Sequence, residues 1–260
     1  MERCHDTRER WGRPKWLLTW TSVIPGMTYP PVNGLQLYAG RAARLSLHQG
    51  TVSVEPTGEH HRLMAAWAGG WSGTYAPAMT NVQDRYQQVS NGFDAAVRAV
   101  TPDKWEAQSP CEQWRARDVV AHVVAGHRGV IAGVRGGESK PLATDEDPRR
   151  AWEEASRTID EITGDPEALA KEIDGPVGRM PAGQIIGRFV TMDLLVHTWD
   201  LARAVGADER LDEDSVRHAY EALKPMDAMI RQPNVFGPKL ETPPGADLQT
   251  EFLYFLGRRA

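Results

Sequence analysis

The sequence predicts an all-α protein: a four-helix bundle with one or two extra short helices at the C-terminal end, preceded by a largely irregular N-terminal segment. Two observations predict this fold class. After Met79, apolar residues recur at steps of three and four in four long stretches, as on one face of an α-helix. Pro and Gly separate these stretches at places where helices end. Residues 79–260 suffice to enclose one bundle core.

The first predicted helix carries one continuous apolar stripe. It ends at Thr101, because the residue before a proline is pushed out of the helical region. The second helix is predicted to begin around residues 116–118, where the acidic Asp118 suits the helix dipole, and to end near Gly136. The stripe of the first helix consists of Val82, Tyr86, Val89, Phe93, Val97 and Val100.

The third helix is predicted to follow the acidic residues 145–147 and Pro148, and to close at Gly164. Its apolar face carries Trp152, Ala155, Ile159 and Ile162. Between the third and fourth helices, residues 173–177 read as a turn with short extended flanks, at best a small hairpin.

The fourth predicted helix spans residues 184–205, and Gly206 is its natural C-cap. A fifth helix begins at Asp212 or Glu213. Residues 231–245 are rich in Pro and Gly and are predicted to form a loop. A short last helix packs Leu248, Phe252 and Phe255 or Leu256.

Composition excludes several classes of function. The formal net charge is −5 and the isoelectric point is about 5.9, so no cationic surplus exists to neutralise the phosphates of a nucleic acid. No run approaches the roughly 18 consecutive apolar residues that a membrane helix needs. The two cysteines, Cys4 and Cys111, do not make a disulfide framework, which fits a cytoplasmic protein.

Asp193 and His197 are the strongest candidate functional residues. They lie four positions apart on the fourth predicted helix, so both side chains can reach one point in space. His122 lies in a similarly apolar stretch of the second helix. A carboxylate and two imidazoles can bind a divalent metal and leave positions on it open. The spacing alone leaves the alternative that these are core histidines paired with a carboxylate.

Four other residues need an interpretation. His127 lies about 140° around the helix from His122, so it is predicted to be solvated or to support the ligands from outside. Cys111 reads as a buried thiol more readily than as a reactive thiolate. Asp200 either orients an imidazole, or acts as a cap or pairs with Arg203, and these alternatives stay open. Trp114 is interpreted as core or pocket wall.

Three stretches resemble one known group of proteins. Residues 109–122 (SPCEQWRARDVVAH) are similar to the entry into the second helix of the DinB-like bundles. Residues 194–204 (LLVHTWDLARA) and 246–258 (ADLQTEFLYFLGR) resemble signatures of the actinobacterial metal-binding proteins related to mycothiol-dependent maleylpyruvate isomerase. The resemblance implies that His122, Asp193 and His197 bind a divalent metal. The isomerase has Glu in the position that corresponds to Asp193.

The resemblance also implies a function. The expected protein binds a divalent metal, with zinc preferred and nickel, iron or cobalt also compatible. It would use mycothiol or a similar thiol with an electrophilic substrate, as an S-transferase or an isomerase, and would be a monomer or homodimer. The isomerase carries a further α/β domain, whereas the residues after Gly206 read as helix, loop and helix, which disfavours maleylpyruvate itself as substrate. A non-catalytic, stress-related metal-binding bundle is the alternative. No catalytic or thiol-binding residue is assigned.

Residues 1–78 differ from the rest. Their net charge is +3, against −8 from Met79 onward, and they hold five of the nine tryptophans. They show no lasting helical period and no paired alternating strands. A secretory signal and a small extra domain are both conceivable. An over-long reading frame with the true start at Met79 is favoured, because the resemblance begins there. The chain is therefore divided into residues 1–78 and a metal-binding bundle of residues 79–260.

Overall fold

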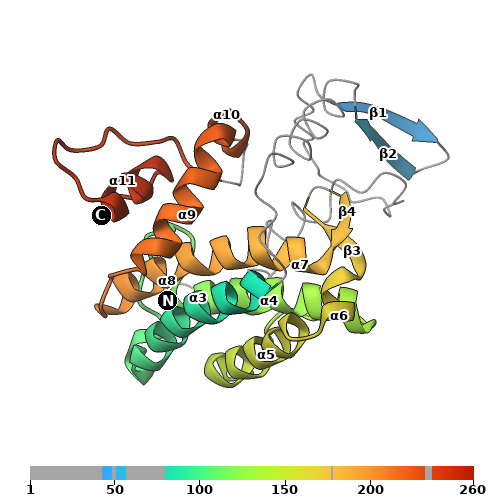
Figure 1. The fold of residues 1–260 in the computed structure, drawn as a ribbon, viewed down its shortest axis with the longest axis horizontal. Coiled ribbons are helices and arrows are strands. Elements are labelled where there is room, and N and C mark those ends of the chain that lie inside the picture. The colour runs from blue at the N-terminus through green and yellow to red at the C-terminus, as the bar shows by residue number, and fades with distance from the viewer. Residues whose placement is uncertain (1–42, 49–50, 57–79, 177, 232–235) are drawn as a thin grey trace, which may run out of the picture. The chain divides into compact units, whose positions relative to one another are not determined.

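A computed structural model describes residues 43–48, 51–56, 80–176, 178–231 and 236–260. The chain divides into two units, and each is described by itself. The first unit contains a hairpin of β1 (Ala43–His48) and β2 (Thr51–Pro56), drawn in blue in Figure 1. The two strands are antiparallel, and Leu45 pairs with Val54.

This hairpin corrects one expectation from the sequence. Both six-residue strands alternate apolar and polar residues, and the register from Ala43–Pro56 to His48–Thr51 leaves two residues for the connection. Strands this short contain only two or three apolar residues each, too few for the alternation to indicate a strand from the sequence alone. The other residues of the segment 1–78 lie outside the described residues, so the expectation of irregular structure there stays a prediction.

Four long helices form the bundle of the second unit, as the sequence predicts. Helices α3 and α4 each pack against both α5 and α8, so the four helices close around one core (Figure 1). The core side chains are the predicted apolar stripes: Tyr86, Phe93, Trp152 and Ile159 are at most 1% exposed. The helices are α3 (Thr80–Ala99), α4 (Ala116–Arg135), α5 (Pro148–Thr163) and α8 (Thr191–Val205).

Local signals determine where these helices begin and end. The carboxylate of Asp118 accepts a hydrogen bond from the backbone N–H of Arg115 and so starts α4. The Asp147 carboxylate accepts from the backbone N–H groups of Arg149 and Arg150 at the start of α5. Gly206 takes the left-handed conformation (φ 72°) after α8. The caps of α4 and α8 place the ends of the two helices that carry the candidate ligands.

The fourth predicted helix differs from expectation in two ways. It begins two residues earlier, with α7 (Ala182–Ile185), and it contains a π-helical turn, η3 (Ile186–Val190), before α8. The hydroxyl and the backbone N–H of Thr191 both donate to the carbonyl of Ile186, five residues back, which widens the turn. Such turns are frequent at functional sites, and this one directly precedes Asp193.

Short elements connect and extend the bundle, and the small hairpin and the C-terminal helices among them match the prediction. The pair β3–β4 forms a two-stranded sheet between α6 and α7. At the C-terminal end, α9 packs against α11, and the predicted extra short helices are therefore confirmed. These elements are η2 (Pro102–Lys104), α6 (Pro166–Ala170), β3 (Glu172–Gly175), β4 (Gly178–Pro181), α9 (Glu213–Leu223), η4 (Lys224–Met226), α10 (Asp227–Ile230) and α11 (Leu248–Phe255).

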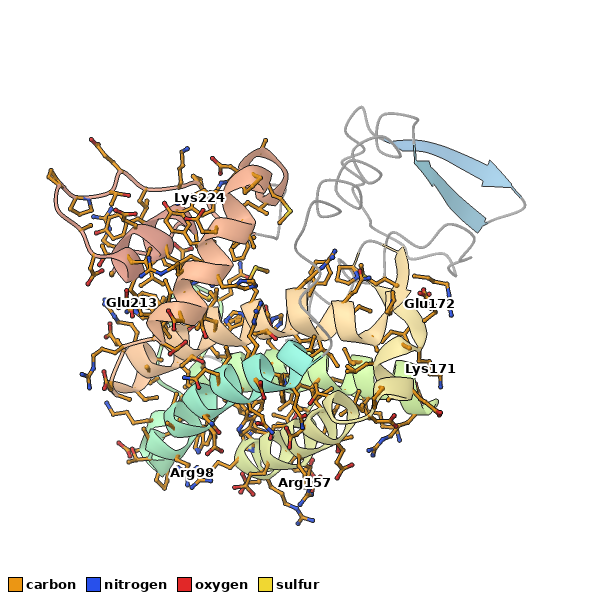
Figure 2. All side chains as sticks on the ribbon, in the orientation of Figure 1. Arg98, Arg157, Lys171, Glu172, Glu213 and Lys224 are labelled. Carbon is orange, nitrogen blue, oxygen red and sulfur yellow. The ribbon has the colours of Figure 1, made fainter. Side chains whose placement is uncertain are left out.

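Charged side chains cover the outside of the second unit. Figure 2 shows labelled examples that point away from the helices, and all six are exposed: Arg98, Arg157, Lys171, Glu172, Glu213 and Lys224. Among the described residues, no helix is both long enough and apolar enough to cross a membrane.

We expect the bundle to fold without residues 1–78. The large, fully buried side chains of the bundle core lie between Tyr86 and Leu256, so deletion of residues 1–78 should leave this core intact. The melting temperature of the truncated chain should stay within about 2 °C of the full chain, since loss of 1 kcal/mol would shift it by about 2–4 °C. A larger fall in thermal unfolding experiments would show that the segment stabilises the bundle.

Candidate metal centre

The structure brings the three predicted ligands together. His122 projects from α4, and Asp193 and His197 project from α8, which packs against α4. One ligand atom from each of the three residues lies within 4.8 Å of the others. The Nε2 atom of His122 lies 3.1 and 3.2 Å from the two carboxylate oxygens of Asp193, and Nε2 of His197 lies 3.4 Å from Oδ1. Both imidazoles thus direct the same nitrogen at one carboxylate.

The cluster is open on one side. The Asp193 side chain is 32% exposed, whereas His122 is 12% and His197 only 7% exposed. Trp114, which precedes α4, lies against both imidazoles, with ring centroids 4.8 Å from His122 and 5.5 Å from His197. Access from solvent is therefore over Asp193, beside a half-buried aromatic wall. The interpretation of Trp114 as pocket wall fits this position.

Asp200 orients the imidazole of His197. The Nδ1–H group of His197 donates to Oδ2 of Asp200 at 2.9 Å, which leaves Nε2 directed at Asp193. Asp200 is fully buried and pairs with Arg258, whose Nε and terminal nitrogen each donate at 2.8 Å. Of the roles left open by the sequence, Asp200 takes that of orienting an imidazole. Arg203 pairs with Glu209 instead.

Electrostatics hold this cluster in a charged state. Burial lowers the pKa of His197, but Asp193 and Asp200 raise it more, to about 9. Burial raises the pKa of Asp200, but Arg258 and His197 lower this pKa by more than burial raises it, so the carboxyl group stays ionised. Without a metal, His197 is thus a cation between two carboxylates. A metal would replace the proton that Nε2 shares with Asp193.

The donor set fits a divalent metal. Two imidazole nitrogens and one carboxylate match the ligands of zinc, nickel, iron or cobalt. Around one ion at roughly 2.0–2.2 Å, ligand atoms lie about 3–4 Å apart, so side chains that now span at most 4.8 Å would need to move by less than about 1 Å. Three protein ligands also leave a coordination position open on the exposed side.

Cys111 contacts the same cluster as a protonated thiol. Its sulfur lies 3.7 Å from Oδ2 of Asp200 and 4.0 Å from Arg258. Burial and the nearby Asp200 carboxylate raise the pKa of Cys111 to about 12. The thiol is only half-buried, but it carries no charge at neutral pH, so the structure favours an unreactive thiol over a reactive thiolate.

His127 is a core residue, and the expectation that it is solvated was wrong. It is 2% exposed, its Nδ1–H donates to the carbonyl of Val123, and Nε2 accepts from the hydroxyl of Tyr86. Trp152 packs edge-on against its ring. The helical period correctly places His127 on a different face of α4 from His122. The face that carries His127 also points into the bundle, because α4 is covered by both α5 and α8.

His127 should make the fold sensitive to acid. Burial lowers the pKa of His127 to about 4 from its usual 6.5. Below pH 6.5 His127 binds a proton in the unfolded chain but stays neutral in the folded chain. The free energy of unfolding therefore falls as the pH falls, and this loss is complete below about pH 4. We expect the free energy of unfolding to drop by about 2 kcal/mol from this group between pH 7 and pH 5.

Urea denaturation of the parent and of His127→Gln at both pH values measures this contribution. The glutamine variant cannot titrate, so it should be less stable at pH 7 but should lose about 2 kcal/mol less on acidification. An identical pH dependence in both proteins would contradict this account of His127.

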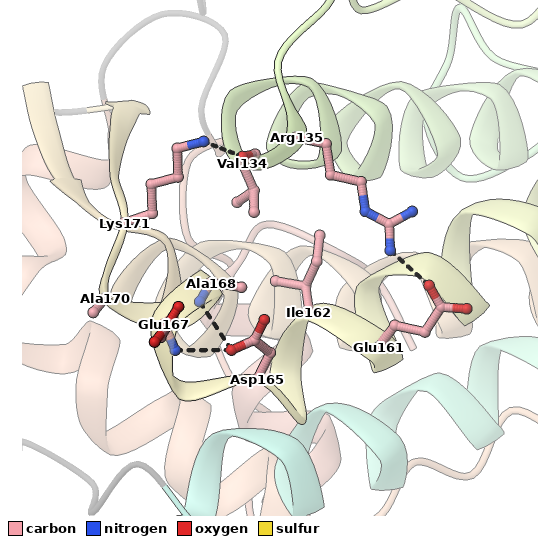
Figure 3. A pocket seen from close by; sticks show the side chains of 9 residues that line it. All are labelled: Val134, Arg135, Glu161, Ile162, Asp165, Glu167, Ala168, Ala170 and Lys171. Atoms are coloured by element: carbon pink, nitrogen blue, oxygen red, sulfur yellow. Dashed lines mark hydrogen bonds and ion pairs between the residues drawn. The ribbon is translucent and has the colours of Figure 1, made fainter.

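A groove of about 640 Å³ lies elsewhere on the second unit, between the end of α4 and α5–α6. Figure 3 shows that Arg135 pairs with Glu161 and that Lys171 donates to the carbonyl of Val134. Val134 is 12 residues from His122 along α4, or about 18 Å. This groove is therefore separate from the candidate metal centre.

Sequence reasoning missed Arg258. It lies 58 residues after Asp200, and no periodicity connects the two. The only available signal was that Arg258 closes the third stretch of resemblance, residues 246–258.

Comparisons with known proteins identify relatives of this chain. Residues 86–202 match the model of the family described as "Mycothiol maleylpyruvate isomerase N-terminal domain". An uncharacterized protein of Mycobacterium tuberculosis, found in strains CDC 1551 / Oshkosh and ATCC 25618 / H37Rv, is 30% identical over 129 residues, which is 50% of this chain and 70% of that protein. The crystal structure of a histidine-to-alanine mutant of mycothiol-dependent maleylpyruvate isomerase aligns with a TM-score of 0.44 at 15% identity, covering 60% of this chain and 70% of that one.

Proposed function

Because this chain belongs to the family of the mycothiol maleylpyruvate isomerase N-terminal domain, we propose that it is a divalent metal-dependent enzyme that uses a low-molecular-weight thiol such as mycothiol. The observation that carries this proposal is the convergence of His122, Asp193 and His197, with both Nε2 atoms directed at one partly exposed carboxylate. The reaction class is transfer of the thiol sulfur to an electrophilic carbon, or a related isomerisation.

The residues have distinct roles in this proposal. His122, Asp193 and His197 would hold the metal from the protein side, and Asp200 keeps the Nδ1 atom of His197 protonated so that Nε2 is available. Trp114 shields the two imidazoles and offers an apolar wall to a substrate that enters over Asp193. A bound divalent ion would supply Lewis-acid chemistry, lowering the pKa of a thiol that binds at its open position.

Activity should depend on both metal and thiol. Purified protein loaded with zinc is expected to consume mycothiol in the presence of an electrophilic substrate, to stop when a chelator removes the metal, and to recover on addition of zinc. Product formation by mass spectrometry, with N-acetylcysteine as a simpler thiol, measures this. Zinc binding without turnover of any thiol would favour the non-catalytic metal-binding bundle instead.

A further inference from the structure

Arg258 belongs to the C-terminal turn, yet it contacts the interior of the bundle next to the candidate ligands. Its guanidinium makes a two-pronged contact with Asp200: Nε donates to Oδ1 and a terminal nitrogen to Oδ2, both at 2.8 Å. Asp200 is fully buried on α8 and Arg258 is 14% exposed. This planar, two-pronged geometry is specific to arginine and fixes the orientation of the carboxylate.

The backbone before Arg258 fixes its direction. Gly257 has a left-handed conformation (φ 78°), and a Cβ atom there would lie 2.7 Å from the carbonyl oxygen of Pro238. The N–H of Arg258 donates to the carbonyl of Leu253 at 2.8 Å, which ties the turn to α11. The chain after α11 can therefore adopt this turn only with glycine at 257, and the turn delivers Arg258 to Asp200.

Asp200 needs a partner to act on His197. A fully buried carboxylate is tolerated only when its charge is paired and its oxygens are hydrogen-bonded. Arg258 donates two of these hydrogen bonds to the Asp200 carboxylate. A third comes from Nδ1–H of His197 at 2.9 Å, and this bond selects Nε2 as the imidazole nitrogen that faces Asp193. The chain of contacts runs from the C-terminal turn through Asp200 and His197 to the open side of the cluster.

We infer that Arg258 is a positioning residue of the metal centre, which acts through Asp200 to hold His197 with Nε2 facing the metal. This inference rests on the proposed metal site. It assigns the last turn of the chain, far from the three ligands in sequence, a part in metal affinity. Loss of an outer partner of a metal-bound histidine typically lowers metal affinity 10–100-fold.

A double-mutant cycle on zinc affinity tests the inference. The proteins are the parent, Asp200→Asn, Arg258→Gln and the double variant, each titrated with zinc against a chelator. Asp200→Asn and Arg258→Gln are each expected to weaken zinc binding about 10–100-fold. Because Arg258 acts through Asp200, the double variant should bind zinc no more weakly than Asp200→Asn alone. Additive losses in the double variant would overturn the inference.

Two matched variants separate positioning from a general effect on charge. Arg203 lies on α8 near Asp200 but pairs with Glu209, so Arg203→Gln should leave zinc affinity unchanged. Arg258→Lys keeps the charge without the two-pronged geometry and should restore only part of the affinity. If Arg258→Gln fails to fold, equal zinc affinity of Asp200→Asn and the double variant still supports the inference, and a further loss overturns it.

A spectroscopic readout distinguishes positioning from mere stability. In zinc-loaded protein labelled with ¹⁵N-histidine, His197 of the parent should show a protonated Nδ1 and a metal-bound Nε2, and Arg258→Gln should perturb this signal. An unchanged signal and unchanged affinity in Arg258→Gln, alongside zinc binding by the parent that is lost in His197→Ala, would overturn this inference alone. Absence of zinc binding by the parent would instead overturn the proposed function.

Discussion

Replacing His197 by alanine is expected to lower zinc affinity by more than about 100-fold. The substitution removes one of three protein ligands, a larger loss than removal of an outer partner, which already lowers affinity 10–100-fold. His122→Ala should have a similar effect, because both imidazoles direct Nε2 at Asp193. Competition titration with a chelator, followed by metal analysis of the dialysed proteins, measures the loss.

Two controls define what the result means. Asp193→Glu keeps a carboxylate and should still bind zinc. His218→Ala removes an imidazole that lies on α9 and contacts Arg85, and it should leave zinc affinity unchanged. Equal zinc content in the parent, His122→Ala and His197→Ala would show that the cluster is an ion-pair network of the core. Metal binding that followed Cys111 or His127 would contradict the assignment of ligands.

Replacing Trp152 by alanine is expected to destabilise the fold by about 3–5 kcal/mol. Trp152 is fully buried and packs edge-on against Phe93 of α3 and His127 of α4. Among the described residues, its Nε1 atom has no hydrogen-bond partner, so the loss is one of burial and packing. Removal of the indole would leave a cavity where α3, α4 and α5 meet.

Chemical denaturation of Trp152→Ala and of Arg157→Ala compares a buried and an exposed position of the same helix. The exposed Arg157 variant should stay within about 0.5 kcal/mol of the parent. Similar losses in both variants would mean that α5 is stabilised by its surface rather than by the core.

The bundle could be predicted from the sequence because each long helix carries its own evidence. The stripe from Val82 to Val100 repeats over five turns, and caps such as Gly206 mark the ends. Asp193 and His197 stood out for a similar reason, since they are related by one helical turn. His122 joined them as a ligand only through the resemblance to known metal-binding proteins. The features that residue spacing alone could predict are therefore those set by neighbouring residues within one helix.

The parts that the sequence did not predict depend on contacts between distant segments or on weak local signals. The pairing of Asp200 with Arg258 joins α8 to the turn after α11, and sequence spacing cannot distinguish Arg258 from Arg203 as the partner. The burial of His127 depends on which helices cover α4. The π-helical turn before Thr191 arises from one shared carbonyl, which no apolar pattern records.

Anomalous diffraction at the zinc edge, from crystals of the zinc-loaded protein, tests the metal centre most directly. The account predicts one peak within about 2.0–2.2 Å of Nε2 of His122, Nε2 of His197 and a carboxylate oxygen of Asp193, with a further position open toward solvent. A zinc peak that lies away from these three side chains, or no peak in crystals grown with excess zinc, would contradict it.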